Sequence, residues 1–191
     1  IVNRRKPSVS REDYQPYEAD DDGIAPMANC GDGYRIHITG LTHDERGYPA
    51  MNAEGQEKMV ARLVYKIRNN RENIIRTKNF HLDDADVVVV SYGISARSSM
   101  QAVRHARNEG MKAGLIKLET LWPFPEELIR SVAPQVKAMI MAEINGGQMA
   151  LELERCAAGA CSVSLVSNFG GAIIHPGLIY NAIVRAVKGK I

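Results

Sequence analysis

The chain has 191 residues, of which 45% are hydrophobic and 24% are charged, with 24 basic and 22 acidic side chains. These proportions are typical of globular proteins and exclude disorder along the whole chain. The formal net charge of +2 argues against a dedicated nucleic-acid-binding protein, which usually carries a strong basic excess. No apolar run approaches the roughly 18 residues of a membrane-spanning helix, and no signal peptide opens the sequence. We therefore expect a cytoplasmic protein without nucleic-acid or membrane partners, and the first residue, Ile1, suggests a piece of a longer polypeptide.

The three cysteines, Cys30, Cys156 and Cys161, are too few and too unevenly placed for a disulfide framework. Four residues separate Cys156 from Cys161, a spacing that fits neither a zinc site nor an iron–sulfur motif. We expect reduced thiols that bind no metal, so any metal cluster that the protein uses is expected on another chain.

Residues 1–34 lack any helical or strand periodicity and contain four basic against seven acidic side chains, with three prolines. Such a segment has little apolar surface to bury by itself. We expect an irregular linker that lies against a neighbouring domain.

Residues 35–81 are expected to form a connecting segment of strand, loop and helix. Residues 34–40 alternate between apolar and polar side chains, which predicts a short strand. Residues 54–76 carry an apolar stripe at helical spacing, which predicts an amphipathic helix. Lys58, Arg62 and Lys66 form a second stripe on that helix, which is either a solvated face or a surface for a subunit or an anion.

Residues 82–191 alternate strand and helix patterns. Strands are expected near 86–92, 113–118, 138–142 and 162–166, and helices at 96–109 behind a Ser95 cap, from Pro125, at 146–158 and at 176–188. Four such alternations predict an α/β fold, a three-layer α/β/α sandwich with a mostly parallel sheet. Residues 74–80 suggest a fifth, antiparallel strand.

Ligands of open parallel sheets lie beyond the carboxyl ends of the strands. Two loops there carry interface or ligand candidates: Trp122, Pro123 and Phe124 in the first, and Glu143, Asn145, Gly146, Gly147 and Gln148 in the second. The loop with Trp122 either fills a space in the core or anchors an interface. The Gly-Gly turn is either an ordinary tight turn or an anion-binding site at the start of a helix. No Walker, dinucleotide, Ser/His/Asp or His-Glu-x-x-His pattern occurs, so we expect no catalytic residue and no metal site in this chain.

A dense polar loop precedes the connecting helix. It consists of Thr42, His43, Asp44, Glu45 and Arg46. Successive polar groups of this kind form either an ordinary turn or a functional loop.

Several motifs together resemble one family. Residues 40–47 (Gly-Leu-Thr-His-Asp-Glu-Arg-Gly) and 118–125 (Leu-Glu-Thr-Leu-Trp-Pro-Phe-Pro) are similar to the alpha subunit of 2-oxoacid:ferredoxin oxidoreductases of the 2-oxoglutarate type. Residues 143–148 and the Phe-Gly-Gly of 169–171, followed by Pro176, extend the match. The resemblance covers about residues 34–191 and implies that 82–191 are a transketolase C-terminal-like domain.

The resemblance implies an anaerobic oxidoreductase that decarboxylates a 2-oxoacid, with 2-oxoglutarate favoured, to its acyl-CoA and passes electrons to ferredoxin. It also implies that residues 1–34 are a linker that connects a preceding thiamine-binding domain to this region. Thiamine diphosphate, Mg²⁺ and an iron–sulfur cluster would lie on other domains or on the beta subunit, so the fragment alone would be inactive. Its expected partners are that beta subunit, with gamma and delta subunits as further candidates, ferredoxin, and coenzyme A as substrate.

The resemblance makes this chain a scaffolding or subunit-contact region, with the 42–46 loop at a junction near the active site. Two alternatives remain open. One is another thiamine-dependent 2-oxoacid dehydrogenase or transketolase-like subunit, and the other is a stand-alone α/β module that binds an anion at the Gly146–Gln148 turn.

Overall fold

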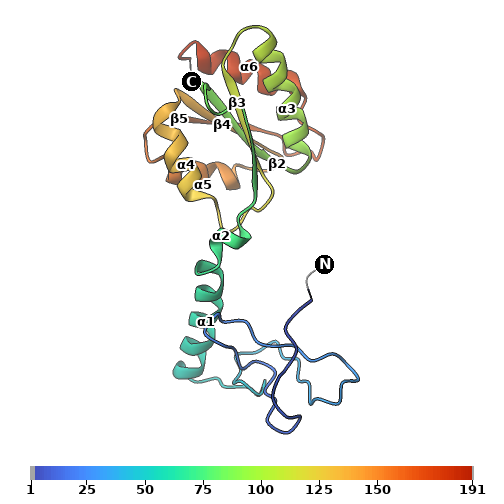
Figure 1. Cartoon of the computed structure of the whole chain (residues 1–191). Helices are drawn as coiled ribbons and strands as arrows, with labels where there is room; N and C mark the ends of the chain where they lie inside the picture. The colour runs from blue at the N-terminus through green and yellow to red at the C-terminus, as the bar shows by residue number, and fades with distance from the viewer. Residues whose placement is uncertain (1–2, 191) are drawn as a thin grey trace. The chain divides into compact units, whose positions relative to one another are not determined.

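A computed structural model describes residues 3–190. The chain divides into two compact units, Ile1–Asn73 and Ile74–Ile191, which are described separately below (Figure 1). The boundary at residue 73 falls inside the expected connecting segment. The division into residues 1–34, 35–81 and 82–191 therefore stays a prediction. Among the described residues, no helix combines the length and the apolar character that crossing a membrane requires.

The regular structure of the first unit is α1, Ala53–Arg68, followed by the start of the short helix α2, Arg71–Ile74. Asn52 caps α1, because its side-chain oxygen accepts a hydrogen bond from Gly55 N–H at 2.8 Å. The single helix expected over 54–76 is interrupted, and the Asn70 side chain donates to the Lys66 carbonyl at 2.8 Å. Asparagine competes in this way with the helical backbone for hydrogen bonds, which explains the break.

The strand expected at residues 34–40 is absent from the structure. These residues have no regular secondary structure and pair with no other segment, and Ile38 is 87% exposed. The described part of the first unit contains only an isolated bridge, between His43 and Pro49. An alternating sequence fits a strand, but a strand needs a hydrogen-bonding neighbour, and residues 3–73 provide none for this segment.

The second unit is built on a five-stranded sheet in the order β1-β3-β2-β4-β5. The strands are β1 (Thr77–Phe80), β2 (Val87–Tyr92), β3 (Ala113–Leu118), β4 (Ala138–Glu143) and β5 (Ser162–Ser167). All neighbouring pairs are parallel except β1 with β3, which pair antiparallel with Thr77 opposite Leu118. The mostly parallel sheet and the additional antiparallel strand confirm the predicted α/β fold.

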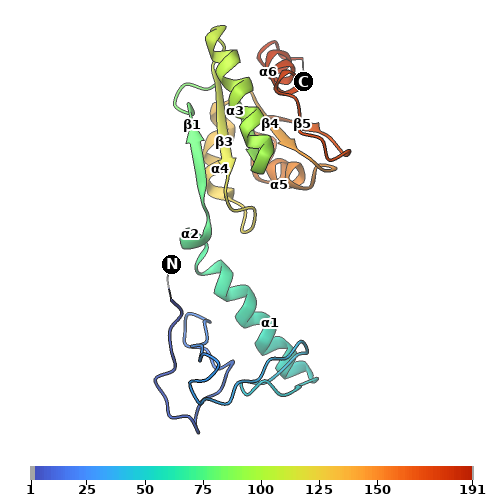
Figure 2. The same cartoon turned by 90° about the vertical axis from the view of Figure 1, so that its right-hand side faces the viewer.

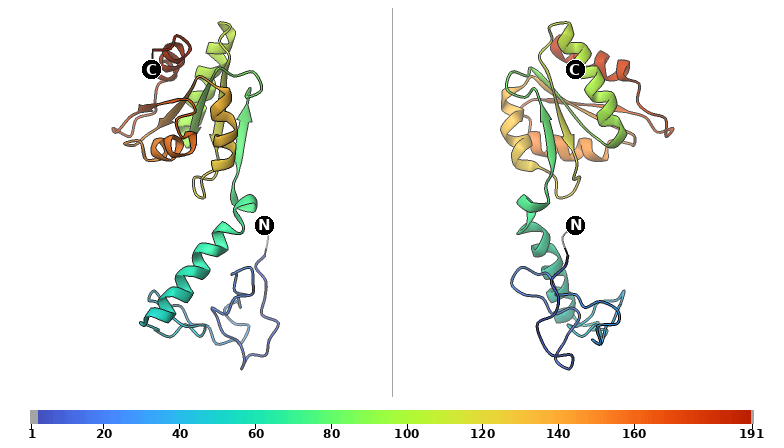
Figure 3. Two further views of the ribbon diagram at one scale, coloured as in Figure 1. Left: turned by 90° about the vertical axis from the view of Figure 1, so that its left-hand side faces the viewer. Right: turned by 45° about the vertical axis from the view of Figure 1, so that its right-hand side comes forward.

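Helices cover both faces of this sheet (Figures 2 and 3). They are α3 (Gly93–Asn108), α4 (Glu126–Val132), α5 (Gln148–Ala157) and α6 (Pro176–Val187), with a 3-10 turn at Ala133–Gln135. α3 and α6 pack on one face and α4 and α5 on the other. The four consecutive valines of β2 are fully buried and alternate between the two cores. Each buried valine contributes about 1.5–3 kcal/mol, so β2 is central to the stability of the unit.

The chain turns from β2 directly into α3, three residues before the expected start at residue 96. Gly93 makes this turn with a φ of +54°, a conformation that glycine adopts without steric cost. Ser95 is therefore not the cap that the sequence predicted. It lies inside the helix, 3% exposed, and its carbonyl accepts a hydrogen bond from the Ser99 hydroxyl at 2.9 Å.

Candidate functional site

Asp44 organises the polar loop of the first unit. One of its carboxylate oxygens accepts hydrogen bonds from the backbone N–H groups of Arg46 and Tyr48, both at 3.0 Å. The other oxygen accepts from the Arg46 guanidinium at 3.1 Å. Desolvation opposes ionisation, but the hydrogen bonds from Tyr48 and Arg46 outweigh it and hold the pKa of Asp44 below its usual value. The loop is thus a side-chain-stabilised turn rather than an extended strip of polar groups.

Gly47 closes this turn in a position that only glycine fits. Its φ is +90°, and a Cβ there would lie 3.0 Å from the ring of Tyr17 and 3.1 Å from His37. The backbone of the loop is therefore held closely against neighbouring rings.

His43 points inward from the same loop. Its Nδ1 lies 2.7 Å from the Leu41 carbonyl, which can only accept a hydrogen bond, so Nδ1 carries the proton. In the neutral ring Nε2 is then an acceptor, and it is buried without a hydrogen-bond partner. The ring lies against that of Tyr17 in a tilted arrangement, with centroids 4.1 Å apart and an interplanar angle of 49°. His43 thus places an acceptor without a hydrogen-bond partner inside the unit, an arrangement that is uncommon for buried polar groups.

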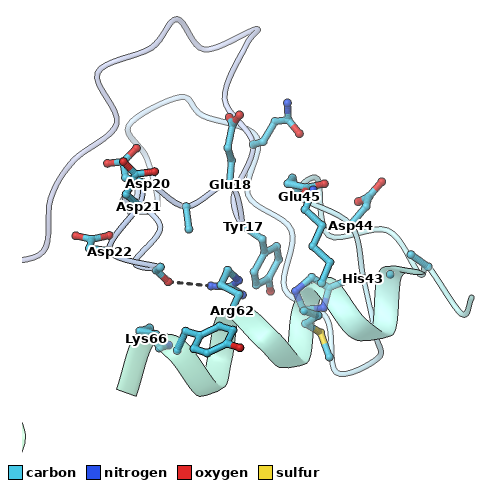
Figure 4. Close-up of a pocket in the computed structure, with 18 of the residues that line it drawn as sticks. Tyr17, Glu18, Asp20, Asp21, Asp22, His43, Asp44, Glu45, Arg62 and Lys66 are labelled. Atoms are coloured by element: carbon cyan, nitrogen blue, oxygen red, sulfur yellow. Dashed lines mark hydrogen bonds and ion pairs between the residues drawn. The ribbon is translucent and has the colours of Figure 1, made fainter. Parts of the chain in front are cut away.

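A cavity of about 780 Å³ lies beside this histidine, between α1 and the loops at residues 15–23 and 43–45 (Figure 4). α1 contributes a basic wall. The loops contribute an acidic wall of Glu18, Asp20, Asp21, Asp22, Asp44 and Glu45. Arg62 donates to the Gly23 carbonyl at 3.3 Å, and Lys58 forms an ion pair with Glu45. The basic stripe of α1 therefore faces the acidic loops of its own unit.

The ion pair between Lys58 and Glu45 shifts both groups toward their charged forms. The Lys58 hydrogen bond lowers the pKa of Glu45, and the Glu45 carboxylate raises the pKa of Lys58. The backbone carbonyl of Glu45 also accepts from Tyr17 N–H at 2.9 Å. Glu45 is thus a link between the polar loop, α1 and the segment that contains Tyr17.

In the second unit, Glu143 is fully buried at the carboxyl end of β4. Its carboxylate accepts hydrogen bonds from the backbone N–H of Met149 and of Ala150, at 3.1 and 3.0 Å, in the first turn of α5. The Tyr92 hydroxyl and the Asn145 amide also donate to it, at 3.0 and 2.9 Å. Glu143 itself offers no surface to a ligand or partner. Its role in the structure is to join β2, β4 and α5.

The Gly-Gly turn before α5 is likewise occupied by the chain's own side chains. The Asn145 side-chain oxygen accepts hydrogen bonds from Gly147 and Gln148 N–H, at 2.8 and 3.1 Å. Together with Glu143, it uses the backbone donors that an anion at this helix start would need. This arrangement corresponds to the tight-turn alternative rather than to the anion site. Gly146 and Gln148 remain exposed.

The tryptophan loop divides into an inward and an outward half. Phe124 is 4% exposed and packs in the core beside α4 and α5, whereas Trp122 is 68% exposed. Pro123 follows Trp122 through a cis peptide bond. The loop is thus a core plug through Phe124, and an interface role for Trp122 stays a prediction.

Two residues of these sites were not singled out from the sequence. Tyr17 lies in a segment without periodicity, and no local signal indicates its contact with His43. Tyr92 could have been found, because it is the last residue of β2, and the neighbouring strand β4 ends at Glu143. Burial first, and then the hydrogen bond to Glu143, raise the pKa of Tyr92.

Among residues 3–190, no three side chains of His, Cys, Asp and Glu are placed to hold a metal ion. Cys30 is exposed in the first unit, whereas Cys156 is buried and Cys161 half-buried in the second. Burial raises the pKa of both the Cys156 and the Cys161 thiol.

Comparisons with known proteins identify the family. Residues 85–179 match the family described as pyruvate:ferredoxin oxidoreductase core domain II. The 2-oxoglutarate synthase subunit KorA of Methanothermobacter marburgensis is 45% identical over 185 residues, which are 96% of this chain and 49% of that protein. The chain belongs to the 2-oxoacid:ferredoxin oxidoreductase family. KorA of Methanocaldococcus jannaschii is 41% identical over 189 residues, 99% of this chain and 49% of its own length.

The chain spans about half the length of the curated relatives it matches. In fold it is similar to a 2-oxoglutarate:ferredoxin oxidoreductase from Magnetococcus marinus with 2-oxoglutarate, coenzyme A and succinyl-CoA bound. The TM-score is 0.79 at 24% identity, over 98% of this chain and 33% of that one. A split-gene transketolase matches 61% of this chain and 42% of its own with a TM-score of 0.51 at 20% identity. Both likenesses support the predicted α/β fold.

Proposed function

We propose that this chain is part of the alpha subunit of an enzyme that oxidatively decarboxylates 2-oxoglutarate to its acyl-CoA, with ferredoxin as electron acceptor. The observation that carries the proposal is the similarity to KorA subunits along 96–99% of the chain, at 41–45% identity. The ketoisovalerate oxidoreductase subunit VorB of Methanothermobacter thermautotrophicus matches only 59% of the chain. This difference favours 2-oxoglutarate over a branched-chain 2-oxoacid.

Within that enzyme, the chain acts as a scaffold and subunit contact rather than as the place of the chemistry. Its helix-start amides at α5 are used internally, and its described residues contain no metal-binding set. Thiamine diphosphate, Mg²⁺ and the iron–sulfur cluster belong to other domains or subunits of the complex. The partners are the beta subunit, with gamma and delta subunits as candidates, and coenzyme A and ferredoxin as reactants of the assembled cytoplasmic enzyme. Trp122 and the exposed residues at the Gly-Gly turn are the interface candidates.

The loop from Thr42 to Arg46 orders a junction near the active site. Two features support this role. Asp44 accepts hydrogen bonds from two backbone N–H groups of the loop and from the Arg46 guanidinium, and His43 holds a buried acceptor without a partner. Such a preorganised loop can present its backbone to a neighbouring domain without a further ordering cost.

The test replaces His43 and Asp44 with alanine, singly, in the assembled complex. Ferredoxin reduction with 2-oxoglutarate and coenzyme A is measured together with the size of the complex. We expect at least a tenfold loss of rate, or dissociation of the complex, for each variant. Asp83→Ala changes an exposed carboxylate of the second unit and serves as the matched control. Unchanged rate and size in both loop variants would reject the junction role.

A further inference from the structure

A groove of about 400 Å³ lies at the free edge of the sheet in the second unit. Its floor is apolar and is formed by Phe80 of β1, Leu115 of β3 and Met100 of α3. Its rim carries three cations: Lys78, Arg97 and Lys117. None of the sites described above uses these residues.

The groove results from the topology of the sheet. β1 is the edge strand, and it extends beyond α3, which packs over β2 and β3 (Figure 2). In the antiparallel register, Phe80 lies opposite Leu115 and Lys78 lies opposite Lys117. Residues two apart on a strand share a face, so the apolar pair and the basic pair lie side by side on the face that carries α3, along the margin of that helix.

The charges on the rim are unbalanced. Like charges directly opposite each other on neighbouring strands destabilise their pairing. Glu119 compensates in part, because its carboxylate lies 3.0 Å from Lys78 Nζ and 3.1 Å from Lys117 Nζ. Hydrogen bonds from these two lysines lower the pKa of Glu119. Arg97 has no ion-pair or hydrogen-bond partner among residues 3–190, so the rim keeps an excess of positive charge.

We propose that this groove receives an acidic, apolar segment of a partner subunit. One large apolar side chain fills the space between Phe80 and Met100, and flanking carboxylates approach Arg97 and the two lysines. A polypeptide fits better than a small ligand, because β1 is a sheet edge whose outward backbone groups can pair with an added strand. That the partner is a subunit rests on the proposed function. The recognition chemistry rests on the groove alone.

The test measures binding of a fluorescent peptide, Asp-Glu-Leu-Phe-Glu-Asp, to the full chain by anisotropy at physiological ionic strength. We expect saturable binding that weakens at least tenfold in Arg97→Glu and in a peptide with serine in place of leucine and phenylalanine. Arg104→Glu reverses an exposed charge on the same helix outside the groove and should leave the affinity unchanged. An equal loss in Arg104→Glu would overturn the proposal, because it would indicate a general charge effect.

Three further results would overturn it. They are the absence of saturable binding, equal binding of the serine peptide, and displacement of the peptide by millimolar inorganic phosphate, which would indicate a simple anion site. Peptide binding does not depend on turnover. A failure here with ferredoxin reduction intact in the complex rejects the groove alone, whereas lost ferredoxin reduction with intact peptide binding rejects only the proposed enzyme.

Discussion

The hydroxyl of Tyr92 donates a hydrogen bond of 3.0 Å to the carboxylate of Glu143. These two residues end the neighbouring parallel strands β2 and β4. The same carboxylate accepts hydrogen bonds from the N–H groups of Met149 and Ala150 in the first turn of α5. A single buried side chain thus joins two strands and a helix at the carboxyl ends of the strands, where ligands of this fold class usually bind.

Replacing Glu143 with alanine should destabilise the second unit strongly. The change leaves the N–H groups of Met149 and Ala150 and the Tyr92 hydroxyl without their acceptor. We expect a loss of about 3 kcal/mol or more in the free energy of unfolding, since each unsatisfied buried donor costs about 1–3 kcal/mol. Urea denaturation of the full chain measures this loss. Glu152→Ala, which removes an ion pair with Arg155 on the exposed side of α5, should cost under about 1 kcal/mol. Equal losses would contradict the buried role.

The carboxyl of Asp44 should titrate below its usual value of about 3.9. Desolvation opposes this shift, but the hydrogen bonds from Tyr48 and Arg46 outweigh it. A lowered pKa in the folded state means that the loop is stabilised above the unfolded pKa, and that this contribution is lost as the pH falls through the folded value. Carboxyl NMR shifts measure the midpoint. Arg46→Ala should raise it, and a midpoint that does not move would show that the guanidinium contributes nothing.

The two aromatic residues of the tryptophan loop should behave differently. Phe124→Ala removes a buried ring and should cost about 3–5 kcal/mol of unfolding free energy. Trp122→Ala changes a ring that is 68% exposed and should leave the stability of the chain nearly unchanged. In the assembled complex, however, we expect the Trp122 variant to bind the beta subunit less tightly. Unchanged subunit affinity, measured by analytical ultracentrifugation, would remove Trp122 from the interface.

The isolated chain should bind none of the small molecules of the reaction tightly. Asn145 and Glu143 use the backbone donors at the start of α5, and a helix start without free donors is a poor anion site. Isothermal titration with thiamine diphosphate, with coenzyme A and with inorganic phosphate checks this prediction. One clear binding event for phosphate would instead support a stand-alone anion-binding module.

The sheet was predictable because its signals are local. The valine run of β2 is apolar on both faces, as a central parallel strand requires, and the glycines and prolines mark the turns. The expected strand at 34–40 was wrong because alternation says nothing about whether a neighbouring strand exists. The start of α3 was misplaced because a glycine with positive φ can replace a polar cap.

The candidate sites were predictable in position but not in role. Glu143 stands at a strand end, where a ligand-binding carboxylate is expected, yet its bonds to α5 and to Tyr92 depend on how β2 and β4 lie together. Likewise, the basic stripe of α1 was visible from its spacing. That it faces acidic loops of the same unit depends on the irregular path of residues 15–23, and no periodicity encodes that path.

The most direct test of the central claim is ferredoxin reduction by the complex assembled with this chain as part of its alpha subunit. We expect reduction that requires 2-oxoglutarate and coenzyme A, that is much slower with pyruvate or 2-oxoisovalerate, and that is absent when the alpha subunit is left out. Reduction at the same rate without the alpha subunit, or a complete preference for another 2-oxoacid, would contradict it.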